Sequence, residues 1–386
     1  MRLLRFIAAA GLAIRVAGHT QDDLDSFEEA QAQAHSRWDY TFGYSGISTF
    51  GHLKHRNCLL EPDLHYDIGI IGVPFDTAVS YRPGARFGPR AIRAASNRHL
   101  PSRSFSPYAG INPYQSWATI YDCGDVPTTP FDNKLALRQM TSSLRELSAR
   151  PWAADSETPR KLLILGGDHS VSLPALRALS QAHGQPLAVV HFDAHLDTLH
   201  PSSYPSVWTS EQSEFTHGTM LWQAWNEGLV RNDSSVHAGL RTRLSGTGWD
   251  DYALDDTQGF TRLTTEDIDE VGPRGIVDAI VKRVGRDAPV YLSIDIDVLD
   301  PSTAPGTGAP EPGGWTMREM NHILRGLGQL NIVGADILEV APPFDDRSET
   351  TSFAAAQIAY EIMTLWVKRG LQDRGQGRPS VHRDEL

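Results

Sequence analysis

The sequence predicts an α/β fold of three layers, in which a doubly wound, mostly parallel sheet carries helices on both faces. Short, nearly continuous apolar runs alternate with helix-length amphipathic segments between residues 66 and 369. Such runs are typical of parallel strands that are buried on both faces. The predicted strands are Asp67–Val73, Lys161–Leu165, Leu187–Phe192, Val236–Leu240, Val290–Ile296 and Ile332–Val340, and Phe353–Lys368 is a predicted final helix.

The composition limits the class of protein. With 40 % hydrophobic residues, the 386-residue chain can form a buried core and is not a disordered protein. Its formal charge of −12 argues against nucleic-acid binding, which needs clustered cations, and suits a cationic small molecule. The two cysteines, Cys58 and Cys123, exclude a disulfide scaffold and a thiolate zinc site, and whether they pair stays open.

Both ends of the chain resemble targeting signals. Two arginines followed by the apolar run Phe6–Ile14 predict a signal peptide over residues 1–18. This run is too short to be a membrane-spanning helix. The chain ends in Arg383-Asp-Glu-Leu386, which is close to the Lys-Asp-Glu-Leu retrieval signal. We therefore expect the secretory pathway and the endoplasmic reticulum (ER) lumen, with a mitochondrial presequence as the alternative, and no membrane span.

Between these ends we expect an N-terminal arm over residues 19–65, one main domain over residues 66–369 and a flexible tail over residues 370–386. Asn232-Asp-Ser234 is a glycosylation sequon, and the sequence does not decide whether Asn232 is modified.

Carboxylates and imidazoles follow three of the predicted strands. Because the carboxyl ends of parallel strands open onto one crevice, we expect these side chains to meet. Their two-residue spacing after a strand also directs alternate side chains to one face. The set is His169, Asp193, His195, Asp197, Asp295 and Asp297.

Four carboxylates this close would repel one another unless cations lay among them. Two divalent ions roughly 3.5–4 Å apart would satisfy the set. Oxygen ligands with some imidazole suit Mn²⁺, and Co²⁺, Ni²⁺ or Zn²⁺ are not excluded. Taken singly, each motif is more often a turn or a cap, so the prediction depends on all three strand ends together.

At these residues the sequence resembles the ureohydrolase family of arginases and agmatinases, most closely the agmatinases. The resemblance covers roughly residues 40–369. Its motifs are Gly166-Gly-Asp-His-Ser170, Asp193-Ala-His-Leu-Asp197, Ser293-Ile-Asp-Ile-Asp-Val-Leu-Asp-Pro301, Glu339-Val-Ala-Pro-Pro343 and His217-Gly-Thr-Met220.

The resemblance implies an arginase-like fold, two Mn²⁺ per subunit, hydrolysis of a guanidine to urea and an amine, and a homo-oligomer. It implies one metal set of His169, Asp193, Asp197 and Asp297, and another of His195, Asp193, Asp295 and Asp297. It also implies that His217 shuttles protons and that Glu339 binds the guanidinium. From the chemistry of the reaction we expect Asp197 to pass on the proton that comes from the attacking water. We interpret His191, inside an apolar strand, as a core residue, and Asp168 and Asp300 as supporting or capping groups.

The segment between Asp197 and His217 is where we expect the tail of the substrate. It contains Glu211, Glu214, Tyr204, Trp208 and Phe215 but no Lys or Arg, and Glu311 could add an acid at the mouth of the site. Acids and aromatic faces favour a cationic amine tail. We therefore expect agmatine, cleaved to putrescine and urea, although loop acids are as often simply solvated.

Three alternatives stay open at this point. The first is guanidinobutyrate or another guanidino acid as the substrate. The second is a zinc amidohydrolase on a similar layered fold. The third is a non-catalytic homologue that binds such ligands without turnover.

Overall fold

A computed structural model describes residues 30–31, 33–34, 37–38, 40–149, 160–203, 208, 210 and 212–375. The chain forms two compact units, Met1–Gly46 and Ile47–Leu386, and every element below belongs to the second. The predicted signal peptide, residues 376–386 with the retrieval signal, Tyr204 and Glu211 lie outside the described residues.

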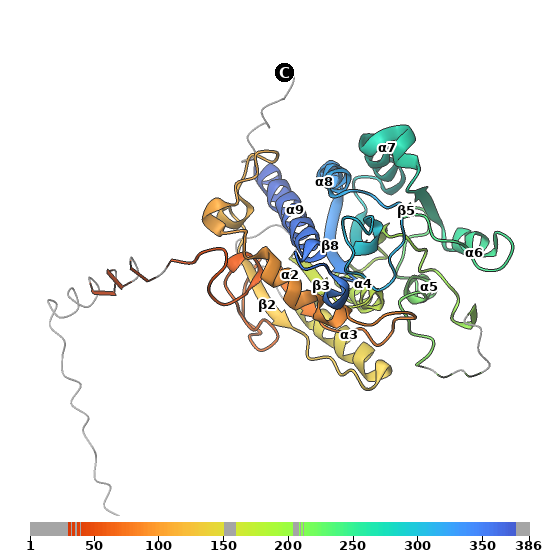
Figure 1. Ribbon diagram of the computed structural model, residues 1–386, viewed down its shortest axis with the longest axis horizontal. Coiled ribbons are helices and arrows are strands. Elements are labelled where there is room, and N and C mark those ends of the chain that lie inside the picture. The colour runs from red at the N-terminus through yellow and green to blue at the C-terminus, as the bar shows by residue number, and fades with distance from the viewer. Residues whose placement is uncertain are drawn as a thin grey trace, which may run out of the picture. The chain divides into compact units, whose positions relative to one another are not determined.

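In the described part of the chain, the second unit is built on one parallel sheet of eight strands (Figure 1). The strand order is β2-β1-β3-β8-β7-β4-β5-β6. The bounds are β1 Ile68–Val73, β2 Ile120–Asp125, β3 Lys161–Gly166, β4 Ala188–Phe192, β5 Ser235–Leu240, β6 Phe260–Thr264, β7 Pro289–Asp295 and β8 Asn331–Leu338. The predicted fold class and all six predicted strands are confirmed, and the sheet is parallel throughout.

The two strands that the sequence pattern does not predict, β2 and β6, are the edges of the sheet. An edge strand has one neighbour, so part of it stays accessible to solvent and keeps polar side chains. The sequences IYDCGD and FTRLT show this mixture, and each strand is only partly buried. These two strands lack a continuous apolar sequence because they lie at the edges of the sheet.

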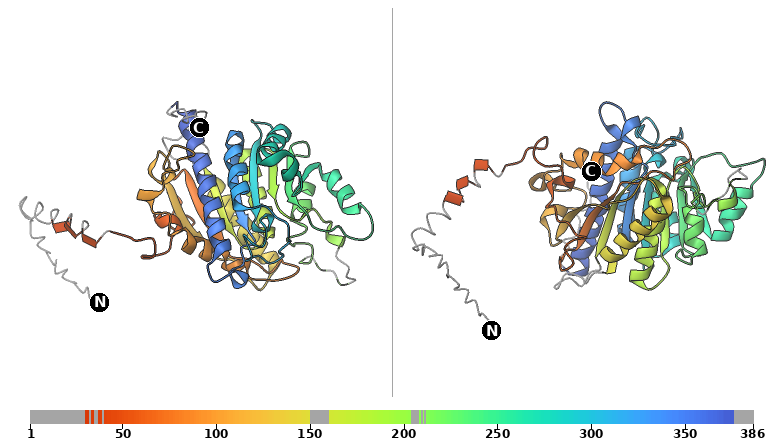
Figure 2. Two further views of the ribbon diagram at one scale, coloured as in Figure 1. Left: turned by 45° about the horizontal axis from the view of Figure 1, so that its top comes forward. Right: turned by 90° about the horizontal axis from the view of Figure 1, so that it is seen from below.

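Helices cover both faces of the sheet (Figure 2). The helices α2 Gly88–Ser96, α7 Asp267–Val284, α8 Met317–Gly326 and α9 Thr350–Asp373 pack on one face, and α3 Asn133–Ala149, α4 Ser172–His183 and α5 Met220–Asn226 pack on the other. The helix α6 Asp250–Gln258 lies against β6. The predicted final helix is present, and it runs past Lys368 to Asp373. The predicted tail from residue 370 therefore begins within α9.

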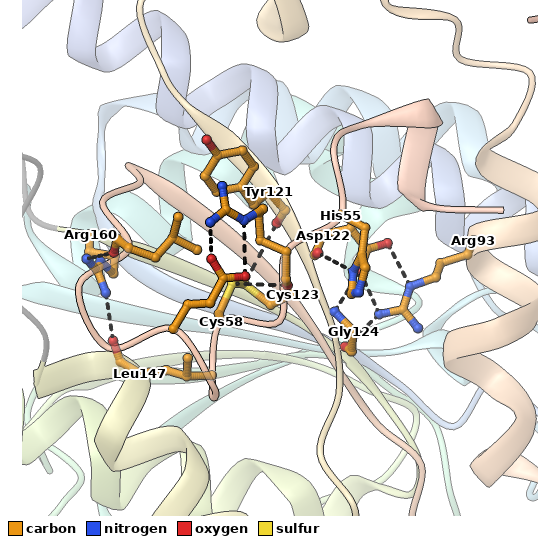
Figure 3. Close-up of a disulfide and its surroundings, with 12 residues drawn as sticks. His55, Cys58, Arg93, Tyr121, Asp122, Cys123, Gly124, Leu147 and Arg160 are labelled. Carbon is orange, nitrogen blue, oxygen red and sulfur yellow. Dashed lines mark hydrogen bonds and ion pairs between the residues drawn. A yellow bond between two sulfur atoms is a disulfide. The ribbon is translucent and has the colours of Figure 1, made fainter. Parts of the chain in front are cut away.

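The segment before β1 belongs to the compact unit, which begins at Ile47, so the predicted arm over residues 19–65 divides at Gly46. Phe50, Leu53 and Cys58 are buried. Cys58 forms a disulfide with Cys123 on β2, which answers the open question of their pairing (Figure 3). The segment is thus attached covalently to the edge of the sheet.

None of the helices in the described residues is long and apolar enough to cross a membrane.

Candidate metal centre

The register of the four central strands brings the predicted ligands together. Phe192 on β4 pairs with Ile294 on β7, so Asp193 and Asp295, the next residues, leave the sheet side by side. Asp295 in turn pairs with Leu338 on β8, which places Glu339 at the same edge. The end of β3 lies on the other side of β8 and leads to His169. The centre thus forms at the carboxyl ends of β3, β8, β7 and β4.

Close packing after β3 directs His169 into the centre. A Cβ on Gly167 would lie 1.7 Å from the carbonyl oxygen of Phe75, so only glycine fits there. Asp168 then accepts hydrogen bonds from the amides of Ser170 (3.1 Å) and Ala78 (3.0 Å). These bonds stabilise the turn, so Asp168 is a capping group rather than a ligand.

The first subsite surrounds His169. Its Nδ1 lies 3.0 Å from Asp193 Oδ2, 3.1 Å from Asp295 Oδ2 and 3.3 Å from Asp197 Oδ2. Its Nε2 lies 2.9 Å from the hydroxyl oxygen of Ser293. If Nε2 donates to Ser293, Nδ1 keeps a lone pair that faces the three carboxylates.

The second subsite surrounds His195. Its Nδ1 lies 2.9 Å from Asp297 Oδ2 and 3.2 Å from Asp193 Oδ1. Asp193 therefore faces both subsites, one with each oxygen. In this structure Asp295 lies beside His169 and Asp297 beside His195, an arrangement that differs from the grouping that the resemblance implies. Asp295 is the last residue of β7 and contacts His169, which follows β3. Asp297 lies in the short 3₁₀ turn Ile296–Val298 and accepts a hydrogen bond from the amide of Ala194, which follows β4.

Burial makes this set of carboxylates unstable as free anions. Burial and the charge of Asp193 raise the pKa of Asp197 to about 7. The same causes, with the charge of Asp297, raise the pKa of Asp295. Asp193 Oδ2 is buried and has no hydrogen-bond partner among the described residues. Cations would remove both penalties, so the residues present fit a metal centre.

Donor atoms gather in two groups, each with all its atoms within 4.8 Å of one another. One group is His169, His191, Asp193 and Asp197, and the other is Asp193, His195 and Asp297. His191 is fully buried, as expected of a core residue, but its Nε2 lies 3.1 Å from Asp193 Oδ2. The side chain of His191 therefore contacts Asp193 in the centre, whereas the sequence analysis interpreted it only as a core residue.

Glu339 and His217 lie next to the first subsite. Glu339 Oε1 accepts a hydrogen bond from the His169 amide (2.9 Å) and lies 3.2 Å from His217 Nδ1. Glu339 and Asp197 both have left-handed backbones, with φ of 57° and 55°. Non-glycine residues adopt this conformation at a cost, and such strain concentrates at functional sites.

Two contacts of His217 have opposite effects on its protonation. The Ser80 amide donates to its Nε2 (3.1 Å), which requires a lone pair there and places the proton of a neutral ring on Nδ1. Burial also disfavours the charged ring, but the hydrogen bond and charge of Glu339 outweigh burial and raise the pKa of His217 to about 9.

A cavity opens above the subsites, and much of its wall was missed by the sequence analysis. The loop after β5 and the start of α6 contribute Thr242, Arg243, Leu244, Ser245, Asp251 and Tyr252. The sequence position of these residues could have indicated that they line the cavity. Ligands bind beyond the carboxyl ends of parallel strands, and this loop follows β5 directly.

The segment that was predicted to hold the substrate tail contributes little to the described wall. Glu214 and Trp208 are exposed and are not among the lining residues, and Phe215 is buried against Phe75. Glu311 lies at the edge of the second subsite, where its Oε1 is 3.9 Å from His195 Nε2. Asp300 accepts hydrogen bonds from the amides of Ser302, Gly313 and Gly314, as expected of a supporting group.

Comparison with known proteins agrees with this geometry. The model of the arginase family matches residues 66–365. The chain is 42 % identical to putative agmatinase 1 of Schizosaccharomyces pombe over 95 % of this chain and 96 % of the relative. It is 41 % identical to an agmatinase of Chromobacterium violaceum over 83 % of this chain and 89 % of the relative.

Among solved structures, proclavaminate amidino hydrolase from Streptomyces clavuligerus superposes with a TM-score of 0.74 at 36 % identity, covering 85 % of this chain and 99 % of the other. A family match over more than half of the chain, with relatives of this identity and coverage, settles the family. The protein belongs to the arginase family and is a ureohydrolase.

Proposed function

We propose that the protein is a Mn²⁺-dependent enzyme with two metal ions per subunit that hydrolyses agmatine to putrescine and urea. The observation that carries the proposal is the pair of donor groups that share Asp193, with Glu339 beside them. Relatives named agmatinase support the choice of agmatine.

His169, Asp193, Asp197 and Asp295 would hold one ion, and His195, Asp193 and Asp297 the other. When bound, the two ions lower the pKa of water enough to supply hydroxide at neutral pH. This chemistry is needed because a guanidinium carbon, whose charge is delocalised over three nitrogens, is a poor electrophile.

Glu339 is the anchor for the guanidinium. Its Oε1 is already engaged by the His169 amide and His217, so the Oε2 side remains for the substrate. Gly308 lies beside this oxygen, since a Cβ there would be 3.5 Å from Glu339 Oε2, an ordinary contact distance. Charge-assisted hydrogen bonds to a planar cation fix its orientation, which brings the reacting carbon over the centre.

The reaction also needs a proton on the departing nitrogen. Guanidinium and water give urea and an alkylammonium ion, so both water protons finish on the products and none is consumed from solvent. Asp197, at the first subsite, is placed to carry a proton from the water to the leaving amine. His217, whose Nε2 meets the exposed Ser80, is placed to exchange protons with solvent.

The cavity wall favours a second candidate substrate. Arg243 is an exposed cation on this wall, and a guanidino acid would present its carboxylate to it. Asp251, on the same wall, would instead attract an amine, although its Oδ2 already accepts a hydrogen bond from the Ser245 amide (2.6 Å). The two candidate substrates therefore differ in which charged residue of the cavity wall contacts the end of the substrate, Asp251 for an amine or Arg243 for a carboxylate.

One experiment tests both. Metal-depleted protein is loaded with Mn²⁺, its metal content is measured, and urea release is followed with agmatine, guanidinobutyrate and arginine. We expect two ions per subunit and the highest kcat/KM for agmatine. A higher kcat/KM for guanidinobutyrate would select the second candidate, and no urea from any guanidine would refute both.

We also propose that the protein resides in the ER lumen. The Cys58–Cys123 disulfide supports this, because disulfides persist in oxidising compartments. Asn232 is exposed, as a glycan acceptor must be. We expect the native protein to lose mass on deglycosylation and to be secreted when its last four residues are deleted. A homo-oligomer remains a prediction, which light scattering tests.

A further inference from the structure

Four leucines line the cavity above the metal centre, and the proposed reaction gives them no role. They are Leu196, Leu199, Leu240 and Leu244, which we call the leucine wall. Leu240 is buried and the other three are half-buried. Contact between apolar side chains and water is unfavourable, so a ligand that covers the leucine wall with methylene groups is stabilised by the hydrophobic effect.

Hydrogen bonds hold the segments around the leucine wall together. Thr242, in the loop after β5, donates from its amide (3.2 Å) and its hydroxyl (2.8 Å) to the carbonyl oxygen of Ala194. Buried Gln258 on α6 donates from Nε2 to the carbonyl oxygen of Thr198 (2.9 Å). These bonds join the segment after β4, the loop after β5 and α6, so the leucine wall is formed before a substrate binds.

The polar groups near the leucine wall are poorly suited to select the end of a substrate. Asp251 Oδ2 already accepts a hydrogen bond from the Ser245 amide (2.6 Å). The ring of Tyr252 lies under the guanidinium of Arg262, with 4.4 Å between the guanidinium carbon and the ring centroid. Arg243, an exposed cation on the same wall, offsets the attraction of Asp251 for an amine. The methylene chain is therefore the part of the substrate that this wall recognises.

We propose that the leucine wall selects substrates by their methylene chain, so that the enzyme also hydrolyses alkylguanidines, which carry no charge at the far end. Glu339 holds their guanidinium as it does in the proposed reaction. An alkylguanidinium ion and water give urea and an alkylammonium ion, so atoms and charge balance as they do for agmatine. This inference rests on the proposed function for its reaction and adds a class of substrate.

The first measurement is urea release from the Mn²⁺-loaded protein with methyl-, ethyl-, propyl- and butylguanidine. Burial of one methylene group corresponds to about a fourfold gain, so we expect kcat/KM to rise about 60-fold over the three added methylenes. Equal kcat/KM values for methylguanidine and butylguanidine would overturn the inference.

The second measurement compares butylguanidine with agmatine, from which it differs only by the terminal amine. A site built around a polar contact rejects an analogue that lacks this contact by about 10⁴–10⁵-fold, whereas an apolar wall does not. We expect kcat/KM for butylguanidine to lie within about tenfold of that for agmatine. A loss of about 10⁴-fold would overturn the inference, because charge would then select the tail.

Two variants and a matched control assign the effect to the leucine wall. Leu199→Ala and Leu244→Ala shorten side chains of the wall, whereas Leu135→Ala shortens an exposed leucine on α3. Each variant is scored by its kcat/KM for butylguanidine divided by that for methylguanidine, because this ratio does not depend on the fraction of folded enzyme. We expect the ratio to fall by about three- to tenfold in L199A and L244A and to stay unchanged in L135A. A wild-type ratio in both wall variants would contradict the assignment.

Binding distinguishes failure of this inference from failure of the proposed function. If no guanidine yields urea, the proposed function is refuted, and calorimetric titration of the Mn²⁺-loaded protein then measures binding alone. A much higher affinity for butylguanidine than for methylguanidine would keep the role of the leucine wall, and equal affinities would refute it. Urea release from agmatine without any dependence on alkyl length would keep the activity and refute the leucine wall.

Discussion

Removing the Cys58–Cys123 disulfide should destabilise the protein by about 4 kcal/mol without changing urea release. The bridge closes a chain segment with a sequence separation of 65 residues. In the chain-entropy account, a loop of this length contributes about 4 kcal/mol at 25 °C by limiting the unfolded chain. Both sulfur-bearing side chains are buried, so the released thiols remain packed in the folded state.

The assay is equilibrium unfolding in urea, followed by tryptophan fluorescence, for three forms of the protein. These are the oxidised wild type, the wild type reduced with dithiothreitol, and the double variant C58A/C123A. The reduced wild type keeps every side chain, so its loss reports the cross-link alone. The double variant adds the cost of two lost sulfur atoms and should be somewhat less stable.

Catalysis should not change, because β2 is the edge strand and is separated from β8 by β1 and β3. If the reduced wild type unfolded at the same urea concentration as the oxidised form, the reasoning would be refuted. A disulfide between residues 65 positions apart must lower the entropy of the unfolded chain. Loss of urea release on mild reduction would refute the independence of the edge and the centre.

Four further predictions concern the site and the core. Glu339→Gln keeps the shape of the side chain but removes its charge, and should lower kcat/KM for the guanidine by about 10²–10³-fold at unchanged metal content. His217→Asn should lower kcat by about 10²–10⁴-fold and KM much less, because proton exchange and not binding is lost. Arg243→Ala should reduce kcat/KM for guanidinobutyrate and leave or improve that for agmatine, since only a carboxylate tail loses its partner. His99 is half-buried against Tyr360, and burial, with the charge of a neighbouring arginine, lowers its pKa to about 4. Between about pH 6.5, the ordinary pKa of histidine, and about pH 4, the unfolded chain binds this proton and the native protein does not. Acid therefore destabilises the fold in this range. His99→Phe should make the free energy of unfolding, measured in urea, less dependent on pH.

Each of these has a clear contrary result. Full activity of Glu339→Gln would place the guanidinium elsewhere, and a large KM effect with constant kcat in His217→Asn would make His217 a binding residue. Equal effects of Arg243→Ala on both substrates would remove Arg243 from recognition of the tail. Parallel pH dependence of wild type and His99→Phe would mean that other groups cause the acid sensitivity.

The predictable part of the fold is the part that is buried on both faces. The six central strands are apolar because helices cover both of their faces, so their pattern is visible in the sequence. The edges β2 and β6 are half-polar for the opposite reason and lack that pattern. The six candidate ligands could be chosen from the sequence because they directly follow buried strands.

Other site features depend on contacts between distant segments. The wall formed by Arg243, Asp251 and Tyr252 has no motif, and its role follows only from the path of the loop after β5. The substrate-tail segment has acids and aromatics in its sequence, yet Phe215 folds into the core and Glu214 stays exposed. Composition cannot show which side of a loop faces the cavity.

By itself, the sequence determined the parallel α/β layers and the set of six candidate ligands at the strand ends, because strand burial and strand-end carboxylates are local properties of the chain. Only the tertiary structure decided which carboxylate meets which histidine, that Cys58 bonds to Cys123, and that His191 contacts Asp193 in the centre. Those outcomes depend on strand order and register, and register is set by packing across the whole sheet rather than by any one segment.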